Sequence, residues 1–170
     1  RGIAFILSVC ILLTLLPAMP FTKAAEVIQR YELDTDGIDA GATYLIVSAG
    51  TAGDANALRF YYDSYWNRDL RNQALTVQSE DGVSYIASGF TNEDDCQFQF
   101  TSASAGRVTH GNYSMDLENS RYVNGSSVET LTFTNLGGGQ YRIHYSSWFR
   151  SYYLRYSNSD WSNSTTSSTV

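Results

Sequence analysis

One stretch near the C-terminal end, residues 137–161, limits the possible fold more than any other part of the chain. Three glycines open it, and apolar residues then alternate with polar ones through 141–145, which is the period-2 pattern of a half-buried strand. A second aromatic and aliphatic run follows at 152–156, and the segment between the runs, 146–151, carries two large aromatic residues. The pattern predicts a β-hairpin with an aromatic turn, and therefore an all-β fold.

Weaker copies of this unit precede it in the chain. Self-similarity on the scale of about 20 to 50 residues indicates a repeat architecture. Three copies, of which the first at 44–58 is the most diverged, predict a β-trefoil-like fold with three diverged repeats. A two-sheet β-sandwich is the alternative, because alternation alone does not fix topology. The two later copies align as Gln97–Thr101, Ala105–His110 and Ser120–Val123 with Thr130–Thr134, Gly139–His144 and Tyr152–Leu154.

The order of elements in each copy resembles the ricin-B-type lectin trefoil. The Gln-x-Trp signature of that family is absent, and Gln97–Phe100 stands in its place. Residues 153–156 and Trp161, together with a Ser/Thr-rich tail, also resemble the ends of modules in secreted surface proteins of Gram-positive bacteria. The resemblance covers most of residues 40–170. It implies a carbohydrate-binding or adhesive module of a secreted bacterial protein.

Residues 1–25 have the composition of a signal peptide. The run 3–17 is almost wholly apolar, with Arg1 before it, and it is shorter than the roughly 20 residues of a membrane-spanning helix. Cleavage is expected after Ala24 or Ala25. We therefore expect a secreted protein, extracellular or associated with a cell surface, with no membrane insertion after cleavage.

The rest of the chain is expected to hold a leading segment or linker at 26–40 and a single all-β domain at 41–170. The tail at 158–170 is rich in Ser, Thr and Asn, as linkers often are. Thr169 and Val170, however, resemble the first half of a final strand. We therefore expect the chain to be truncated before its fold is closed.

Charge and cysteine content exclude some partners. The chain carries 17 acidic and 11 basic side chains, a net charge of −6, and loss of a leader with Arg1 and Lys23 would make it more acidic. Such a surface repels phosphate backbones and anionic lipid, so we expect no nucleic-acid partner. Loss of Cys10 would leave Cys96 alone, which excludes an intramolecular disulfide.

Aromatic residues in turns and loops are the candidate binding residues. One group, at 61–66, lies among Asn, Asp and Arg residues, and the other lies in the predicted turn and near the tail. Ring faces pack on the C–H face of a pyranose, while planar polar groups bond its hydroxyls. We expect Trp66 and Trp148 to be more than about a third exposed. The candidate ligand-binding residues are Tyr61, Tyr62, Trp66, Trp148, Phe149 and Trp161.

The acidic segment 34–39 allows two interpretations. Asp34, Asp36 and Asp39 alternate around Gly37 and could surround a calcium ion with oxygen ligands. The segment lacks the late bidentate glutamate of an EF-hand loop, and an Asp-Gly turn with solvated carboxylates accounts for the same residues. The predicted site therefore includes no metal and no cofactor.

Motifs of catalysis are not visible in the chain. Cys96, Phe98 and Phe100 alternate with polar residues, so Cys96 is predicted to be a small core residue rather than a nucleophile. His110 and His144 occupy polar strand positions, and their spacing gives neither a partner. Asp and Glu are abundant enough to include a glycosidase pair, but no motif marks one. We predict that the protein is not an enzyme.

Two classes of function follow from these patterns. The first is a non-catalytic extracellular module that binds a glycan or a surface protein through exposed rings. The second is a structural or protein-contacting spacer domain of a larger surface protein, in which most rings are buried. Exposure of the tryptophans separates the two classes, because a lectin-like site needs adjacent rings with exposed faces along a shallow groove.

Overall fold

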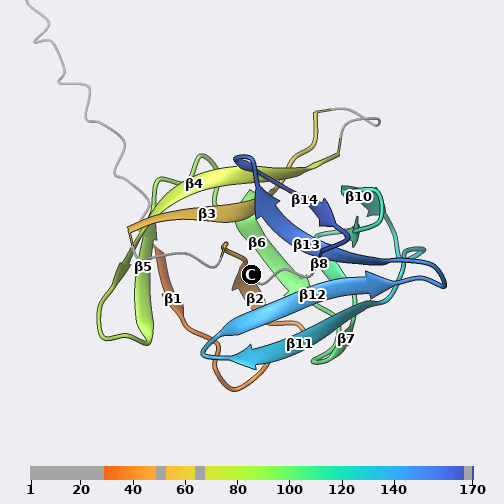
Figure 1. The fold of residues 1–170 in the computed structure, drawn as a ribbon. Helices are drawn as coiled ribbons and strands as arrows, with labels where there is room; N and C mark the ends of the chain where they lie inside the picture. Colours follow the sequence, from red (N-terminus) through yellow and green to blue (C-terminus); the bar gives the residue numbers. More distant parts are fainter. Residues whose placement is uncertain (1–28, 49–52, 64–67, 167–169) are drawn as a thin grey trace, which may run out of the picture.

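The computed structural model describes residues 29–48, 53–63, 68–166 and 170, and the predicted signal peptide lies outside them. The described residues form fourteen β-strands and one short 3₁₀-helix, η1 (Asp94–Cys96), which confirms the all-β class (Figure 1). These strands form three antiparallel sheets, so the two-sheet sandwich does not describe them.

Each sheet has a simple strand order. The first, β1-β5-β4-β3, consists of β1 (Gln29–Glu32), β5 (Ser84–Ser88), β4 (Leu70–Ser79) and β3 (Gly53–Phe60). The second, β10-β9-β8-β6-β2, consists of β10 (Arg121–Asn124), β9 (Tyr113–Asp116), β8 (Val108–His110), β6 (Gln97–Phe100) and β2 (Thr43–Leu45). The third, β14-β13-β12-β11-β7, consists of β14 (Asp160–Ser164), β13 (Ser151–Ser157), β12 (Gln140–Ser146), β11 (Leu131–Gly137) and β7 (Ala105–Gly106). Strand β1 lies within residues 26–40, which the sequence predicts to be a leading segment or linker. Part of that segment therefore belongs to the first sheet, where it pairs with β5.

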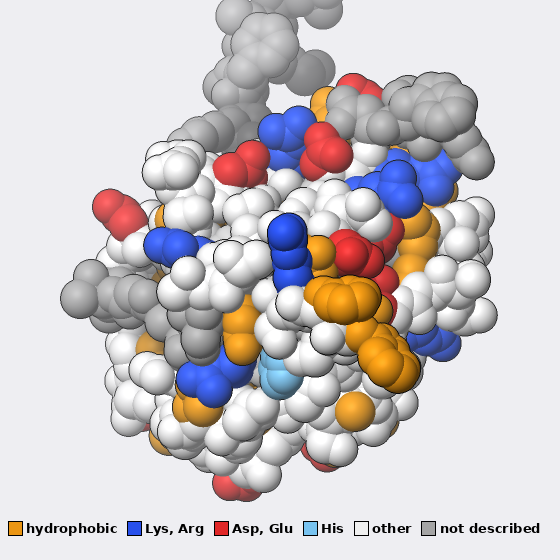
Figure 2. Space-filling model, turned by 45° about the vertical axis from the view of Figure 1, so that its right-hand side comes forward, with side chains coloured by type: hydrophobic (Ala, Val, Ile, Leu, Met, Phe, Trp, Pro, Cys, Tyr) orange, Lys and Arg blue, Asp and Glu red, His pale blue; other side chains and the backbone are white. Residues whose placement is uncertain are grey.

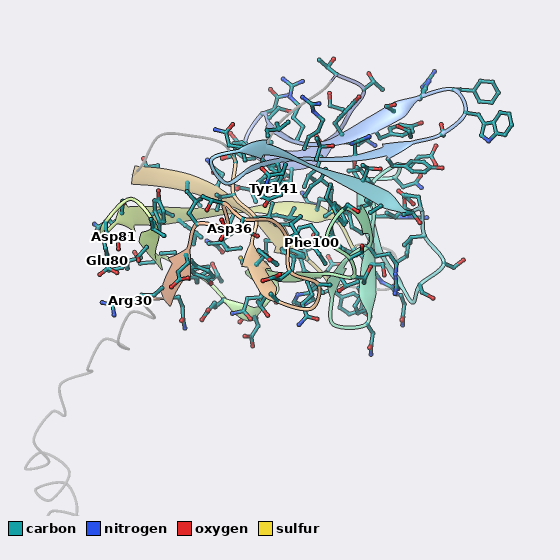
Figure 3. The ribbon with its side chains drawn as sticks, turned by 90° about the horizontal axis from the view of Figure 1, so that it is seen from below. Arg30, Asp36, Glu80, Asp81, Phe100 and Tyr141 are labelled. Atoms are coloured by element: carbon teal, nitrogen blue, oxygen red, sulfur yellow. The ribbon has the colours of Figure 1, made fainter. Side chains whose placement is uncertain are left out.

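Strands β4 and β5 pair antiparallel and form a hairpin. The carboxylate of Asp81 accepts hydrogen bonds from the backbone N–H groups of Ser84 (2.5 Å) and Val83 (2.9 Å). These bonds favour the charged form and lower the pKa of Asp81. Beside the turn, Arg30 of β1 pairs with Glu80 at 3.2 Å (Figure 3).

Strands β11 and β12 are joined by a tight reversal at the three glycines that open residues 137–161. Gly137, Gly138 and Gly139 have φ values of 88°, 62° and 74°. Glycine adopts this left-handed region without the steric cost that a Cβ imposes. The three glycines therefore allow the chain to turn back within a few residues.

Two backbone bridges join the first sheet to the second. Val47, just after β2, pairs with Ala57 of β3, and Asp69, just before β4, pairs with Arg121 of β10. Strands β2 and β10 are the two edge strands of the second sheet. Both edges of that sheet are therefore tied to the first sheet.

The main hydrophobic core takes side chains from all three sheets. Leu58 of β3, Phe98 of β6 and Leu154 of β13 are fully buried in it. The third sheet is also fastened by Asn163 of β14, whose side-chain amide donates to the carbonyl oxygen of Leu117 at 3.1 Å. These contacts fix the position of the β12–β13 hairpin relative to the rest of the molecule.

The strand order corrects one part of the repeat alignment. Strands β6, β8, β9 and β10 are successive neighbours in one sheet, as β11 to β14 are in another. Strand β10, with buried Tyr122, therefore corresponds to β14, with buried Trp161, whereas the alignment paired 120–123 with 152–154 of β13. The intervening strand β9 has three buried residues in a row, so it lacks the alternation that would reveal it.

Candidate functional site

The tip of the β12–β13 hairpin presents two large aromatic side chains to solvent. Trp148 is 99% exposed and Phe149 is 94% exposed. The turn is closed around them: the N–H of Ser147 donates to the carbonyl oxygen of Arg150 (2.8 Å), and the N–H of Arg150 donates to the Ser147 hydroxyl (3.2 Å). The prediction that Trp148 is exposed is confirmed, and Figure 1 shows the hairpin extending away from the body of the molecule.

Cross-strand contacts support this tip from below. The rings of Tyr145 and Tyr152 stack with centroids 6.3 Å apart and planes 9° apart. One step closer to the tip, the hydroxyls of Ser146 and Ser151 lie 3.0 Å apart. Stacked aromatic pairs across two strands stabilise a hairpin, so the tip stands on an ordered stem.

Tyr62 belongs to a second aromatic group, in the loop after β3. Its side chain is half-exposed, and the guanidinium of Arg68 lies 5.4 Å from its ring centroid. Arg68 also lies 5.1 Å from the ring of Tyr113, and the two tyrosine rings are 6.0 Å apart. Tyr62 is therefore a candidate binding residue whose ring is held in place by a cation–π contact.

Tyr61 is less exposed than Tyr62, and its polar group is occupied. Its hydroxyl donates to Asp63 at 3.3 Å, and its ring lies 5.5 Å from the guanidinium of Arg71. The loop after β3 and the hairpin tip are separate parts of the surface (Figure 1). The structure therefore does not combine the predicted residues into one site.

The prediction for Trp161 is wrong. Its side chain is only 2% exposed, and its ring packs against Tyr156 with centroids 5.6 Å apart. The two residues are paired between β13 and β14, on the side of the sheet that faces the core. Trp161 therefore has no free face for a ligand. Trp66 lies outside the described residues.

Four side chains that the sequence prediction omitted lie together on the third sheet. Arg142 and His144 of β12 and Tyr153 and Arg155 of β13 face away from the core, because the residues between them are buried in it. The rings of His144 and Tyr153 stack at 5.4 Å and 25°. The alternation in 141–145 indicates which residues face outward, but only the strand register shows which residues lie beside them.

Cys96 is confirmed as a core residue. Its side chain is fully buried at the end of η1, in a small cluster separate from the main core that holds Phe98 and Phe100, and it forms no disulfide. Burial raises the pKa of the Cys96 thiol to about 12. The thiolate, which is the nucleophilic form, is therefore not populated near neutral pH.

The acidic segment forms a turn. The carboxylate of Asp34 accepts a hydrogen bond from the N–H of Gly37 at 2.9 Å, and the N–H of Asp39 donates to the hydroxyl of Tyr44 at 2.6 Å. Tyr141 lies beside this segment (Figure 3), and burial, followed by the charge of Asp34, raises the pKa of Tyr141 to about 12. Among the residues that the structure describes, no group of three or more His, Cys, Asp or Glu side chains is placed to hold a metal ion. The Asp-Gly turn accounts for this segment.

Comparison with other proteins does not assign the chain to a family. No protein-family model, no curated protein and no solved structure matches it. Within the described ranges, no helix has the length and apolar character needed to cross a membrane. The geometry of the chain's own residues is therefore the basis for a functional proposal.

Proposed function

We propose that this chain is a non-catalytic, secreted binding module with a trefoil-like repeat fold, which binds a carbohydrate through the tip of the β12–β13 hairpin. The observation that carries the proposal is the near-complete exposure of Trp148 and Phe149. Burying one such ring in the core would stabilise the fold by about 1.5–3 kcal/mol. Adjacent large rings left in solvent are typical of interaction surfaces.

The geometry of the turn supports presentation rather than packing of these rings. Ser147 and Arg150 close the turn through backbone and hydroxyl groups, so neither ring is needed to hold it. The indole of Trp148 combines a flat apolar face with an N–H donor. A pyranose ring offers the complement, a C–H face with hydroxyls at its rim.

Titration of the folded chain with plant, mucin and cell-wall polysaccharides tests the proposal. We expect a saturable change in tryptophan fluorescence, and calorimetry should show that binding is lost in Trp148→Ala and weakened about tenfold in Phe149→Ala, a loss of about 1.4 kcal/mol. Calorimetry is needed because Trp148→Ala also removes the fluorescent reporter. Val83→Ala removes an exposed apolar side chain from a different hairpin and should bind normally.

The same titration addresses the alternative function. A flat response to every polysaccharide, from protein shown to be folded by circular dichroism, would rule out the carbohydrate module. It would favour a structural or protein-contacting spacer domain, in which the hairpin tip contacts another protein.

A further inference from the structure

The outward side of the third sheet forms a continuous surface. The register pairs Thr132 with His144, Thr134 with Arg142, and His144 with Tyr153, so these side chains lie on one face of the sheet. The opposite face is buried in the main core. We call this surface the outer face and define it by Thr132, Thr134, Arg142, His144, Tyr153 and Arg155.

Charge on the outer face differs from charge on the chain as a whole. The chain has 17 acidic and 11 basic side chains, and several arginines are neutralised by ion pairs: Arg30, Arg59, Arg71 and Arg121. No ion pair to Arg142 or Arg155 occurs within the part of the chain that the structure describes. The one acidic residue in the strands of the third sheet, Asp160, pairs with Arg71 at 3.3 Å.

The outer face is therefore positively charged in an acidic protein. Figure 2 shows arginine side chains and one histidine among uncharged side chains on this side of the molecule, with acidic side chains next to the exposed hydrophobic ones. Because acidic side chains are in excess, two arginines without a carboxylate partner are available to an anionic group from outside. Charge complementarity thus indicates an anionic ligand.

Packing holds the cationic groups in position. The Nε of Arg142 and the Nδ1 of His144 are buried, and neither has a hydrogen-bond partner among the described residues. The base of the Arg142 guanidinium is thus covered by its neighbours. A side chain that is already immobilised loses less entropy when a ligand binds.

The uncharged residues of the outer face suit a sugar. The stacked rings of His144 and Tyr153 provide a flat aromatic surface next to the arginines. Thr132 and Thr134 carry hydroxyl groups on β11, opposite His144 and Arg142 of the neighbouring strand β12. Neighbouring strands in a sheet lie about 4.8 Å apart. Hydroxyls bond sugar hydroxyls, and arginine binds a carboxylate or a sulfate through two parallel N–H groups.

From these observations, we propose that the outer face binds the anionic groups of an acidic glycan, carboxylated or sulfated. This inference rests on the proposed carbohydrate-binding function and adds the chemical class of the ligand. The hairpin tip belongs to the same two strands, so one polysaccharide chain can reach both surfaces. A nucleic acid is a poorer fit for two reasons. Its dense row of phosphates needs more cationic partners than two arginines, and the net charge of −6 on the chain repels it.

Matched polysaccharides test this proposal with the full chain. The carboxylate arm compares polygalacturonate with its methyl ester, and the sulfate arm compares dextran sulfate with dextran. We expect at least one acidic form to bind about tenfold or more tighter than its neutral counterpart, and salt to weaken that binding. Arg142→Gln and Arg155→Gln should each weaken binding of the acidic form about tenfold and leave binding of the neutral form unchanged. Arg30→Gln, which removes an exposed arginine elsewhere, is the matched control and should change nothing.

Proton NMR of the two histidines gives a second readout. An anion bound at the outer face should raise the pKa of His144, because it stabilises the charged ring beside Arg142, Tyr153 and Thr132. The NMR signals of His110, which lies in the second sheet with its ring stacked on Phe60 at 4.3 Å, should not move on addition of polysaccharide. A merely structural role for Arg142 would leave the pKa of His144 unaffected by the polysaccharide.

The outcomes separate this inference from the proposed function. Equal affinity for acidic and neutral forms would overturn the acidic preference and leave the carbohydrate module standing. Tighter binding of single-stranded DNA than of any polysaccharide would replace the glycan by a nucleic acid. No binding of any polysaccharide would overturn both proposals.

Discussion

Trp148 and Trp161 lie 13 positions apart in sequence, one in the turn before β13 and the other in β14 after it. One side chain is exposed and the other is buried. Trp148 lies in the turn at the tip of the β12–β13 hairpin, where its side chain is almost wholly exposed. Trp161 lies on a strand, and its pairing with Tyr156 directs it to the buried side of the sheet. The environment of each ring is thus set by its position on the hairpin or strand and not by residue type.

This difference predicts the effect of truncating each ring. Trp161→Ala should lower the free energy of unfolding by about 3–5 kcal/mol, because it leaves a cavity in the core. Trp148→Ala should change it by no more than about 0.5 kcal/mol, because an exposed side chain makes few contacts. Urea denaturation followed by far-UV circular dichroism measures both. Equal effects of the two substitutions would contradict the burial described for Trp161.

Exposure at these residues could be predicted only in part. The exposed position of Trp148 follows from its place between two strongly alternating runs. Burial of Trp161 could not be predicted, because β14 is a short strand of Ser and Asn residues around one ring, and its composition resembles a linker. Arg142 and His144 were expected at polar strand positions, but their joint surface with β13 depends on pairing across strands.

At the scale of the hairpin, the β11–β12 turn depends on glycine for two separate reasons. Gly138 has a positive φ and open space around the position of a Cβ. Gly139 also has a positive φ, but a Cβ there would lie 2.5 Å from Cδ1 and 2.7 Å from Cγ of Leu33. Substitution at Gly139 therefore adds a steric clash with the segment after β1 to the backbone strain that both positions share.

Alanine substitution distinguishes the two effects. Gly138→Ala should cost about 1–2 kcal/mol of unfolding free energy from backbone strain alone. Gly139→Ala should cost more, because Leu33 must also move. Thermal or urea unfolding of the two variants provides the comparison, and a Gly139→Ala variant as stable as Gly138→Ala would show that Leu33 does not pack against this turn.

Alternation in the sequence predicts a long hairpin well, since β12 pairs with β13 as expected. It predicts the short strands poorly. Strand β9 has only four residues, of which three in a row are buried, so neither the helical nor the strand period is visible. Because β9 was missed, the repeat alignment matched β10 with the wrong strand of the last copy.

At the scale of the whole molecule, one core joins the three sheets. Residues from each of them belong to the same hydrophobic cluster, and both edges of the second sheet are bridged to the first. Such a molecule should unfold in a single cooperative transition. Several ionisable groups are buried in or against the two hydrophobic clusters, so the stability of the fold also depends on pH.

Alkaline pH should destabilise the fold. Burial raises the pKa of Cys96 from its ordinary 9.0, and that of Tyr141 from 10.0, each to about 12. Both groups are protonated when folded and ionise more readily when unfolded, so their contribution is complete below about pH 9 and is lost as pH rises towards 12. Each group contributes a slope of at most about 1.4 kcal/mol per pH unit.

Urea denaturation between pH 8 and pH 11 measures this dependence. Cys96→Ala should be less stable than the natural chain at pH 8, because it loses buried side-chain volume, but its stability should fall less steeply with pH. An unchanged slope in Cys96→Ala would mean that the thiol titrates in the folded protein much as it does in the unfolded chain.

The turn between Ser147 and Arg150 closes without help from the two residues at its centre. Mutation at positions 148 and 149 should therefore have little effect on folding, so under the proposed function ligand choice and fold stability can change separately. Related chains could recognise different ligands by exchanging only these two side chains. The same property makes the tip a suitable place to insert a randomised library, with the three sheets serving as an inert scaffold.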